Sequence, residues 1–303
     1  MRAFVGPGRG TQTVGDFVIM TDSSCDLPAR LAEEMELTVL PLHVEVDGQK
    51  YINYLDEREI AFSEIYAKLR TKCPAKTSAV NTQEFLEPME ALLKGGKDIL
   101  YIGFSSGLSG TYSAGATAAA ELAARYPERK LMAVDSLCAS LGQGLLVWHA
   151  WHQKQAGKTI EEVYQFVLDN RLNLCHWFTI DDLMFLKRGG RISGATAIVG
   201  SMLSIKPVMH VDNEGHLIKV GTARGRKASL RALADEAEKR GLNLSEQTVF
   251  ISHGDCLADA NYLADIMRKR FGVKDVLINY VGPVIGAHSG PGTVALFFLG
   301  SER

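Results

Sequence analysis

The sequence predicts a two-domain α/β protein: a parallel, doubly wound sheet in the first domain and a partly antiparallel sheet in an α+β second domain. Three observations support this prediction. Short apolar runs alternate with helix-like segments through the first half, as in parallel sheets covered by helices. In the second half an Asp-Asn-Glu-Gly turn at 212–215 separates two strand-like runs, as in a β-hairpin. The 303 residues are enough for two domains of about 150 residues each.

The expected strands of the first half are short apolar runs that end in polar or glycine-containing turns. Longer segments between them are expected to be helical. Pro28 lies near the first turn of one helix, and Asn81 with Glu84 can form a capping box at the start of another. Residues 71–81 are expected to form a loop. The expected strands are 17–20, 38–46, 98–104 and 131–134, and the expected helices are 27–35, 60–70, 81–94, 114–125, 141–155 and 160–171.

The second half mixes hairpin strands with helices, which is typical of an α+β domain. We place the junction near residues 172–176. Residues 1–15 are then a mobile leader, 16–174 a Rossmann-like α/β domain and 175–303 an α+β domain. The expected strands are 177–180, 205–211, 217–221, 248–252, 276–280 and 293–299, and the expected helices are 182–187, 226–240 and 258–271.

The composition argues against several classes of function. The net charge of −2 gives no general attraction to nucleic acid or to an anionic membrane. No apolar stretch approaches the roughly 18 residues that cross a bilayer, and residues 1–15 contain no hydrophobic signal segment. The five cysteines are scattered and include no Cys-x-x-Cys, which suits reduced thiols. We therefore expect a cytoplasmic protein without stable membrane insertion.

The most informative segment is the Gly/Ser-rich stretch 103–113, which lies between an apolar run and an Ala-rich helix. Free N–H groups and the positive end of the helix dipole meet at such a helix start and favour an anion. Hydroxyl groups of Ser105, Ser106, Ser109 and Thr111 add further donors. The stretch therefore predicts a site for a carboxylate or a phosphate. The chain shows no Gly-x-x-x-x-Gly-Lys-Ser/Thr motif for ATP.

The same stretch leaves two other interpretations open. It contains a Gly-x-Ser-x-Gly match centred on Ser105, which is the nucleophile pattern of serine hydrolases. His253 or His288 could then act as the base. Asp212 or Asp255 could orient that histidine. A further Gly-Leu-Ser-Gly before the helix and the absence of a His-Gly-Gly-Gly segment argue against a hydrolase. In the second interpretation the hydroxyl groups only cap the helix.

Three other motifs carry polar groups that suit a ligand or a purely structural role. Thr77 and Ser78 precede an expected helix, where they could cap it or face a ligand at the edge of the sheet. The Gly/Pro-rich segment 282–292 is expected to be a long loop carrying His288. The run 187–191 surrounds a Gly-Gly turn with basic side chains, which suits an oxyanion or a solvated helix end.

Two remaining clusters receive simpler interpretations. His149 and His152 could contact one metal ion from a helix, but no third ligand lies at a suitable spacing, so we expect no metal site. Basic residues between 224 and 231 form one end of an expected helix. They suit a solvated face or the docking of a partner.

Five ordered blocks together resemble the DegV family of bacterial fatty-acid-binding proteins. The resemblance covers about residues 16–300. The blocks are Thr-Asp-Ser-Ser-Cys-Asp-Leu-Pro at 21–28, Lys-Thr-Ser at 76–78, Ser-Ser-Gly-Leu-Ser-Gly-Thr-Tyr at 105–112, Phe-Leu-Lys-Arg-Gly-Gly-Arg-Ile at 185–192 and Gly-x-x-x-Gly-x-His-x-Gly-Pro-Gly at 282–292.

The resemblance implies a two-domain α/β protein that holds one long-chain fatty acid between its domains. Some members of the family are the carrier subunit of bacterial fatty-acid kinase and present the carboxylate to a separate, ATP-using kinase subunit. It thus implies a lipid-binding carrier in phospholipid metabolism that is not itself an enzyme and needs no cofactor.

The resemblance also implies the residues of the site. Thr77 and Ser109 would hold the carboxylate. His288 and Arg191 would lie near the same head group. Arg224 matches an arginine that engages the kinase in carrier subunits. The expected fatty-acid-binding residues are Thr77, Ser78, Ser109, Gly110, Arg191 and His288.

The chain departs from the family pattern at one block. Many members continue the Thr-Ser block with Gln-Pro, where this chain has Ala79 and Val80; the difference affects the loop rather than its hydroxyl groups. Residues 193–203 are small and apolar, a composition that suits a tunnel wall and a buried core helix equally well.

Overall fold

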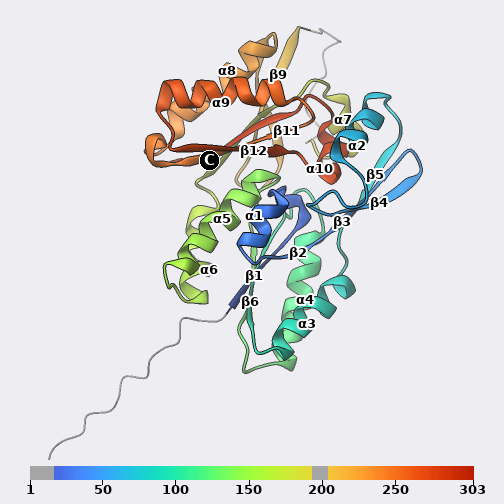
Figure 1. Cartoon of the computed structure of the whole chain (residues 1–303), viewed down its shortest axis with the longest axis vertical. Helices are drawn as coiled ribbons and strands as arrows, with labels where there is room; N and C mark the ends of the chain where they lie inside the picture. Colours follow the sequence, from blue (N-terminus) through green and yellow to red (C-terminus); the bar gives the residue numbers. More distant parts are fainter. Residues whose placement is uncertain (1–16, 193–203) are drawn as a thin grey trace, which may run out of the picture.

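Three β-sheets and the helices around them make up the computed structural model of the protein (Figure 1). The structure describes residues 17–192 and 204–303. The expected leader, residues 1–15, and the small apolar segment 193–203 therefore lie outside the described residues.

The first sheet is parallel, with strand order β2-β1-β6-β7. Its strands are β1 (Phe17–Asp22), β2 (Thr38–Leu40), β6 (Asp98–Gly103) and β7 (Leu131–Asp135). Ile99 and Tyr101 of β6 pack with helices α3 (Thr82–Lys94) and α4 (Thr111–Arg125), whereas Leu100 and Ile102 pack with α5 (Leu141–Gln155) and α6 (Ile160–Asn170). Successive side chains of a strand point to opposite faces, so residues 99–102 of β6 are all apolar because both faces of the sheet are covered. The predicted doubly wound sheet is confirmed.

A small antiparallel sheet, which the sequence did not predict, has strand order β4-β3-β5. It contains β3 (Leu42–Val46), β4 (Gln49–Asn53) and β5 (Ala75–Ser78). The strand expected over 38–46 divides at Pro41 into β2 and β3, which join different sheets because proline cannot donate to a ladder. The loop expected over 71–81 contains β5, whose Thr77 pairs with Val44. Its polar sequence forms a strand only because β3 supplies the partner.

The second half forms a six-stranded sheet with order β10-β9-β8-β13-β11-β12. Strands β11 and β12 are parallel and the other neighbours are antiparallel, as predicted. The 212–215 turn joins β9 to β10, which confirms the predicted hairpin. The strands are β8 (Leu174–Thr179), β9 (Ile205–Val211), β10 (Leu217–Arg224), β11 (Thr248–His253), β12 (Asp275–Tyr280) and β13 (Val294–Leu299).

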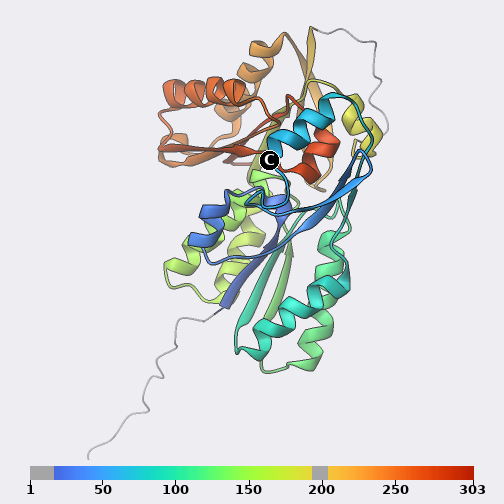
Figure 2. The same ribbon diagram turned by 45° about the vertical axis from the view of Figure 1, so that its right-hand side comes forward.

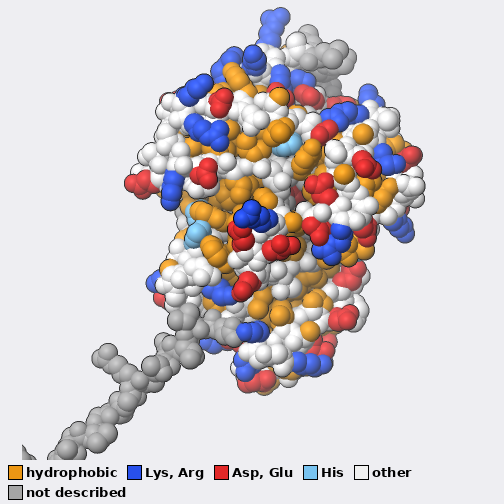
Figure 3. All heavy atoms as spheres, in the orientation of Figure 1, with side chains coloured by type: hydrophobic (Ala, Val, Ile, Leu, Met, Phe, Trp, Pro, Cys, Tyr) orange, Lys and Arg blue, Asp and Glu red, His pale blue; other side chains and the backbone are white. Residues whose placement is uncertain are grey.

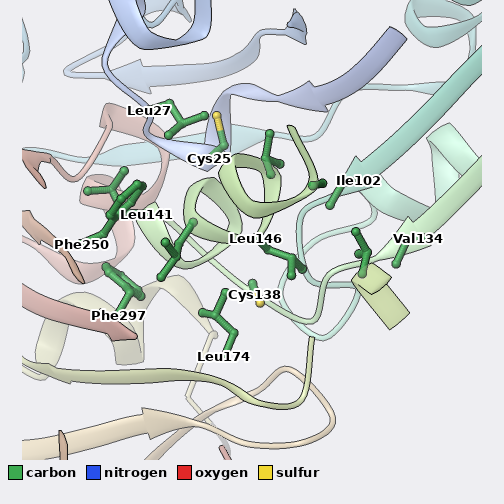
Figure 4. Packing of buried hydrophobic residues seen from close by; sticks show 14 of the residues in the cluster. Cys25, Leu27, Ile102, Val134, Cys138, Leu141, Leu146, Leu174, Phe250 and Phe297 are labelled. Atoms are coloured by element: carbon green, nitrogen blue, oxygen red, sulfur yellow. The ribbon is translucent and has the colours of Figure 1, made fainter. Parts of the chain in front are cut away.

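Helix α5 joins the two larger sheets. Helices α8 (Arg226–Arg240) and α9 (Leu257–Phe271) cover one face of the six-stranded sheet. The other face turns toward α5, where Phe250 and Phe297 pack with Leu141 and Leu146 (Figure 4). The same cluster reaches Ile102 of the parallel sheet, so both halves share one continuous core.

Two helices differ from expectation near the ends of strands. The segment 282–292, expected to be a loop, contains α10 (Pro283–Ser289), with Pro283 in the first turn. Helix α7 (Met184–Gly189) begins two residues after the expected start at 182. Figure 2 shows α10 beside α2 (Phe62–Arg70), and α10 also contacts α7, β3 and β5. These contacts bring α10, from the second half of the chain, to the small sheet.

The surface carries mixed charge. Acidic and basic side chains are interspersed over most of the face shown in Figure 3. Within the part of the chain that the structure describes, no helix has both the length and the apolar character to cross a membrane.

Candidate functional site

A cavity of about 150 Å³ lies between the two halves of the protein. Its walls come from β5, the loop after β6, the start of α5, the six-stranded sheet and α10. Most of the lining is apolar and includes Leu42, Phe104, Leu108, Phe178, Val284 and Phe297. An apolar cavity with a few polar groups at defined places is the usual form of a small-molecule site.

All six fatty-acid-binding residues that the family resemblance implied line this one cavity. They come from four segments that are distant in the sequence: β5, the loop before α4, the turn after α7, and α10. The sequence alone did not show that these segments meet. The residues are Thr77, Ser78, Ser109, Gly110, Arg191 and His288.

Thr77 and His288 are in direct contact. Thr77 Oγ1 lies 2.8 Å from His288 Nε2. Burial, and then the positive charge of Arg191, lower the pKa of His288 to about 4, so the imidazole is neutral at pH 7. When Nε2 carries the proton it donates to Thr77, and the threonine hydroxyl proton is left for a ligand. A Cβ on Gly189 would lie 2.3 Å from His288 Nδ1, so the ring needs glycine there.

Ser109 lies at the start of α4. Its Oγ accepts a hydrogen bond from the Thr111 N–H at 3.2 Å and lies 2.9 Å from Thr111 Oγ1. Helix α4 begins at Thr111, three residues before the expected start at 114. The first N–H groups of an α-helix have no acceptor within the helix. The serine hydroxyl and the positive end of a 15-residue helix therefore meet at the cavity.

Arg191 connects α7 to the Gly/Ser-rich loop. Its Nε donates to the Leu108 carbonyl at 3.3 Å, and its Nη1 donates to the Gly189 carbonyl at 2.6 Å. Because Arg191 also lines the cavity, it places a positive charge beside His288.

Ser105 has a structural role in the described contacts. Its side chain is fully buried, and its Oγ donates to the Gly215 carbonyl at 2.9 Å and accepts from the Gly107 N–H at 3.2 Å. A Cβ on Gly107 would lie 2.8 Å from the Glu214 carbonyl oxygen. The loop thus supports the turn of the β9–β10 hairpin. His253 Nδ1 instead accepts from the Cys256 N–H, so these contacts give the serine-hydrolase interpretation no support.

Sequence reasoning missed a buried polar network beside the cavity. Asp22 is fully buried and accepts from the N–H groups of Ser24 and Phe104, so it holds the first residue after β6. Burial raises the pKa of Asp22. Ser140, beside Asp26, and Ser252 line the cavity as well. The sequence does contain a sign of this network: the block 21–28, which carries both aspartates, directly follows the apolar run 17–20.

The described residues contain no cluster of side chains that suits a metal ion. No group of three or more His, Cys, Asp or Glu side chains there is arranged to hold a metal ion. The rings of His149 and His152 lie 4.9 and 4.1 Å from the Trp148 ring, and burial lowers the pKa of His149 to about 4. These histidines contribute to aromatic packing.

The fold and the cavity define a class: a two-domain α/β protein with a mostly apolar cavity between its domains. The model of the DegV family, described as an uncharacterised protein family, matches residues 16–301. The chain therefore belongs to the DegV family.

Known relatives span nearly the whole chain. A DegV domain-containing protein of Clostridium perfringens is 47% identical over 287 residues, which is 95% of this chain and 98% of the relative. A solved structure of a DegV lipid-binding protein from Thermotoga maritima is 28% identical, with a TM-score of 0.83 and coverage of 95% and 99% of the two chains. A structure that describes fatty-acid binding by a DegV family protein from Thermus thermophilus is 31% identical, with a TM-score of 0.80 and coverage of 94% and 99%.

Proposed function

We propose that this protein binds one long-chain fatty acid in the cavity between its domains. Thr77 and Ser109 hold the carboxylate of the fatty acid, and the acyl chain of the fatty acid lies among the apolar lining residues. The observation that carries the proposal is that hydroxyl, guanidinium and imidazole groups from four separate segments line one mostly apolar cavity. The lipid and fatty-acid binding described for the Thermotoga and Thermus proteins supports the same function.

The polar groups suit a carboxylate. A buried carboxylate is costly unless hydrogen bonds and a positive charge meet it. Thr77 and Ser109 supply hydroxyl donors, Ser78 and Gly110 lie beside them, and Arg191 supplies the charge. A neutral His288 that donates to Thr77 turns the threonine proton toward the ligand, because one hydroxyl oxygen then accepts from the ring and donates to the carboxylate.

The apolar lining suits an acyl chain. Each buried CH₂ contributes up to about 0.8 kcal/mol, reduced by the cost of immobilising the chain. The carboxylate therefore fixes the position of the ligand, while the chain supplies most of the affinity.

In this proposal the protein is a non-catalytic carrier in the cytoplasm, and it needs no cofactor. It presents the carboxylate to a separate fatty-acid kinase, in which a carboxylate oxygen attacks the terminal phosphate of ATP and gives an acyl phosphate and ADP. The acyl phosphate then enters phospholipid metabolism. A carboxylate site in a chain without a Gly-x-x-x-x-Gly-Lys-Ser/Thr motif fits a division of labour between two subunits.

Denaturing the purified protein and identifying the released small molecule by mass spectrometry tests this function. We expect a long-chain fatty acid in roughly equimolar amount. Protein that neither releases a fatty acid nor takes one up when it is supplied would contradict the proposal.

Arg224 is the proposed contact with the kinase. It is an exposed residue at the end of β10. We expect Arg224→Glu to retain fatty acid but to lower kinase-dependent phosphorylation at least about tenfold, because reversing a charge at an interface costs affinity. Arg268→Glu, an exposed substitution on α9, serves as the control. Unchanged turnover of the Arg224 variant with the cognate kinase would remove this residue from the docking surface.

A further inference from the structure

Asp26 lies at the junction of the two halves and is 3% exposed. Its carboxyl oxygen Oδ2 is 2.5 Å from Ser140 Oγ, in the first half. The Gly282 N–H, in the second half, also interacts favourably with this carboxyl group. A Cβ on Gly282 would lie 2.5 Å from Asp26 Oδ1, so the contact requires glycine. The Asp26 carbonyl accepts a further bond, of 2.8 Å, from the Asn279 side chain.

One partner of the carboxyl group lines the cavity, and the other directly follows Val281, which lines it. Ser140 lines it directly, immediately before α5. Gly282 precedes α10, the helix that carries His288. Asp26 therefore sits between the wall formed by the first half and the helix that carries part of the proposed head-group site.

Ser140 is held in a strained backbone conformation, with φ 53° and ψ −144°. Residues other than glycine rarely adopt this combination of φ and ψ, and such strain persists only where the surrounding structure imposes it. Ser140 Oγ also lies 3.0 Å from Ser252 Oγ on β11. The Asp26 and Ser252 contacts supply that constraint.

No positive charge faces the Asp26 carboxyl group among the described contacts. The titratable groups near it are Asp22 and Cys25 from its own segment and Tyr66 from α2. The start of α5, β11 and α10 contribute the uncharged groups of Ser140, Ser252 and Gly282.

Burial, with a small contribution from the charge of Asp22, raises the pKa of Asp26 to about 8. The carboxyl group is therefore protonated at pH 7. The Ser140 hydroxyl has one proton, so it can donate a hydrogen bond either to Asp26 Oδ2 or to Ser252 Oγ, but not to both. A proton on Asp26 completes a chain in which Asp26 donates to Ser140 and Ser140 donates to Ser252.

We propose that Asp26 is a positioning residue of the fatty-acid site: it holds the Ser140 wall against α10 and so slows the escape of the ligand. The inference rests on the proposed function. Asp26 need not touch the fatty acid; it acts through Ser140 and through the helix that carries His288.

Ionisation of Asp26 places an uncompensated charge in this wall. The charge is better solvated when the walls separate and water enters, so the ligand escapes faster as the pH rises through the pKa of about 8. An asparagine at this position remains neutral and keeps a carbonyl oxygen for the Gly282 N–H. Asp26→Asn therefore removes the pH dependence while it retains the neutral form of the contact.

The test measures the dissociation rate of cis-parinaric acid from the full-length protein between pH 6.5 and 9.5. We expect the wild-type rate to rise about tenfold over this range. Asp26→Asn should match the wild type at pH 7 and stay nearly constant, whereas Asp26→Ala should release the probe faster at every pH. Asp265→Asn, an exposed substitution on α9, should reproduce the wild-type profile.

The outcomes separate the two proposals. A wild type that binds no probe at any pH overturns the fatty-acid function and this inference with it. Probe binding with the same pH profile in wild type and Asp26→Asn overturns the role of Asp26 alone. If Asp26→Ala does not fold, Asp26→Asn still decides the question. A folded Asp26→Ala with unchanged dissociation also contradicts the role.

Discussion

Thr77→Ala and Ser109→Ala are each expected to weaken the retention of fatty acid by about tenfold to a hundredfold. A hydrogen bond to a charged group contributes about 1.5–3 kcal/mol, and each 1.4 kcal/mol corresponds to about tenfold in affinity. Thr77→Ala also removes the partner of His288 Nε2. Neither side chain belongs to the hydrophobic core, so the chain should remain folded.

Lipid extraction with mass spectrometry, together with thermal unfolding of each variant, measures this effect. Ser63→Ala, an exposed serine on α2 outside the cavity, should retain the wild-type lipid content. Equal lipid content in the wild type and in both cavity variants would refute the assignment of the carboxylate site.

Arg303→Ala should lower the free energy of unfolding by about 3 kcal/mol. The Arg303 side chain is buried, and its guanidinium donates to the carbonyl groups of Leu137 at 2.7 Å, Asp212 at 2.9 Å and Leu174 at 3.1 Å, and to that of Arg171. The Leu137 and Arg171 carbonyls precede the six-stranded sheet, whereas Leu174 lies in its strand β8 and Asp212 in its β9–β10 turn. A buried carbonyl left without its donor costs about 1–3 kcal/mol, and partial access of water reduces the sum.

With an unfolding entropy of about 2.1 cal/mol/K per residue, the corresponding fall in Tm for a chain of 303 residues is about 5 °C. Thermal unfolding of Arg303→Ala should show it, whereas Arg268→Ala, which removes an exposed ion pair, should leave Tm nearly unchanged. If Arg303→Ala and Arg268→Ala unfold at the same temperature, the contacts of Arg303 do not stabilise the junction between the halves.

Local sequence patterns predicted much of the secondary structure. The helix over 226–240 has the predicted bounds, and Asn81 and Glu84 form the predicted capping box at α3. The 212–215 turn closes the predicted hairpin. Each of these elements depends on residues that are near one another in the chain, so the sequence carries the relevant interactions.

Elements that depend on distant partners were predicted less well. The polar strand β5 exists because β3 pairs with it, and β2 and β3 separate at Pro41 because each joins a different sheet. The Gly/Pro-rich segment that contains α10 looks like a loop, yet a helix forms where α2, α7 and the small sheet surround it. In each case tertiary packing overrides a weak local preference.

The sequence by itself determined the class of the protein, singled out the Gly/Ser-rich loop that lines the cavity and, through five family blocks, named the residues of the candidate site. Only the tertiary structure decided that Thr77, Ser109, Arg191 and His288 line one cavity, and that Asp26 connects its walls. The physical reason is that helix starts and turns arise from neighbouring residues, whereas a cavity arises from the packing of segments that are distant in the sequence, such as Thr77 and His288, which are 211 residues apart.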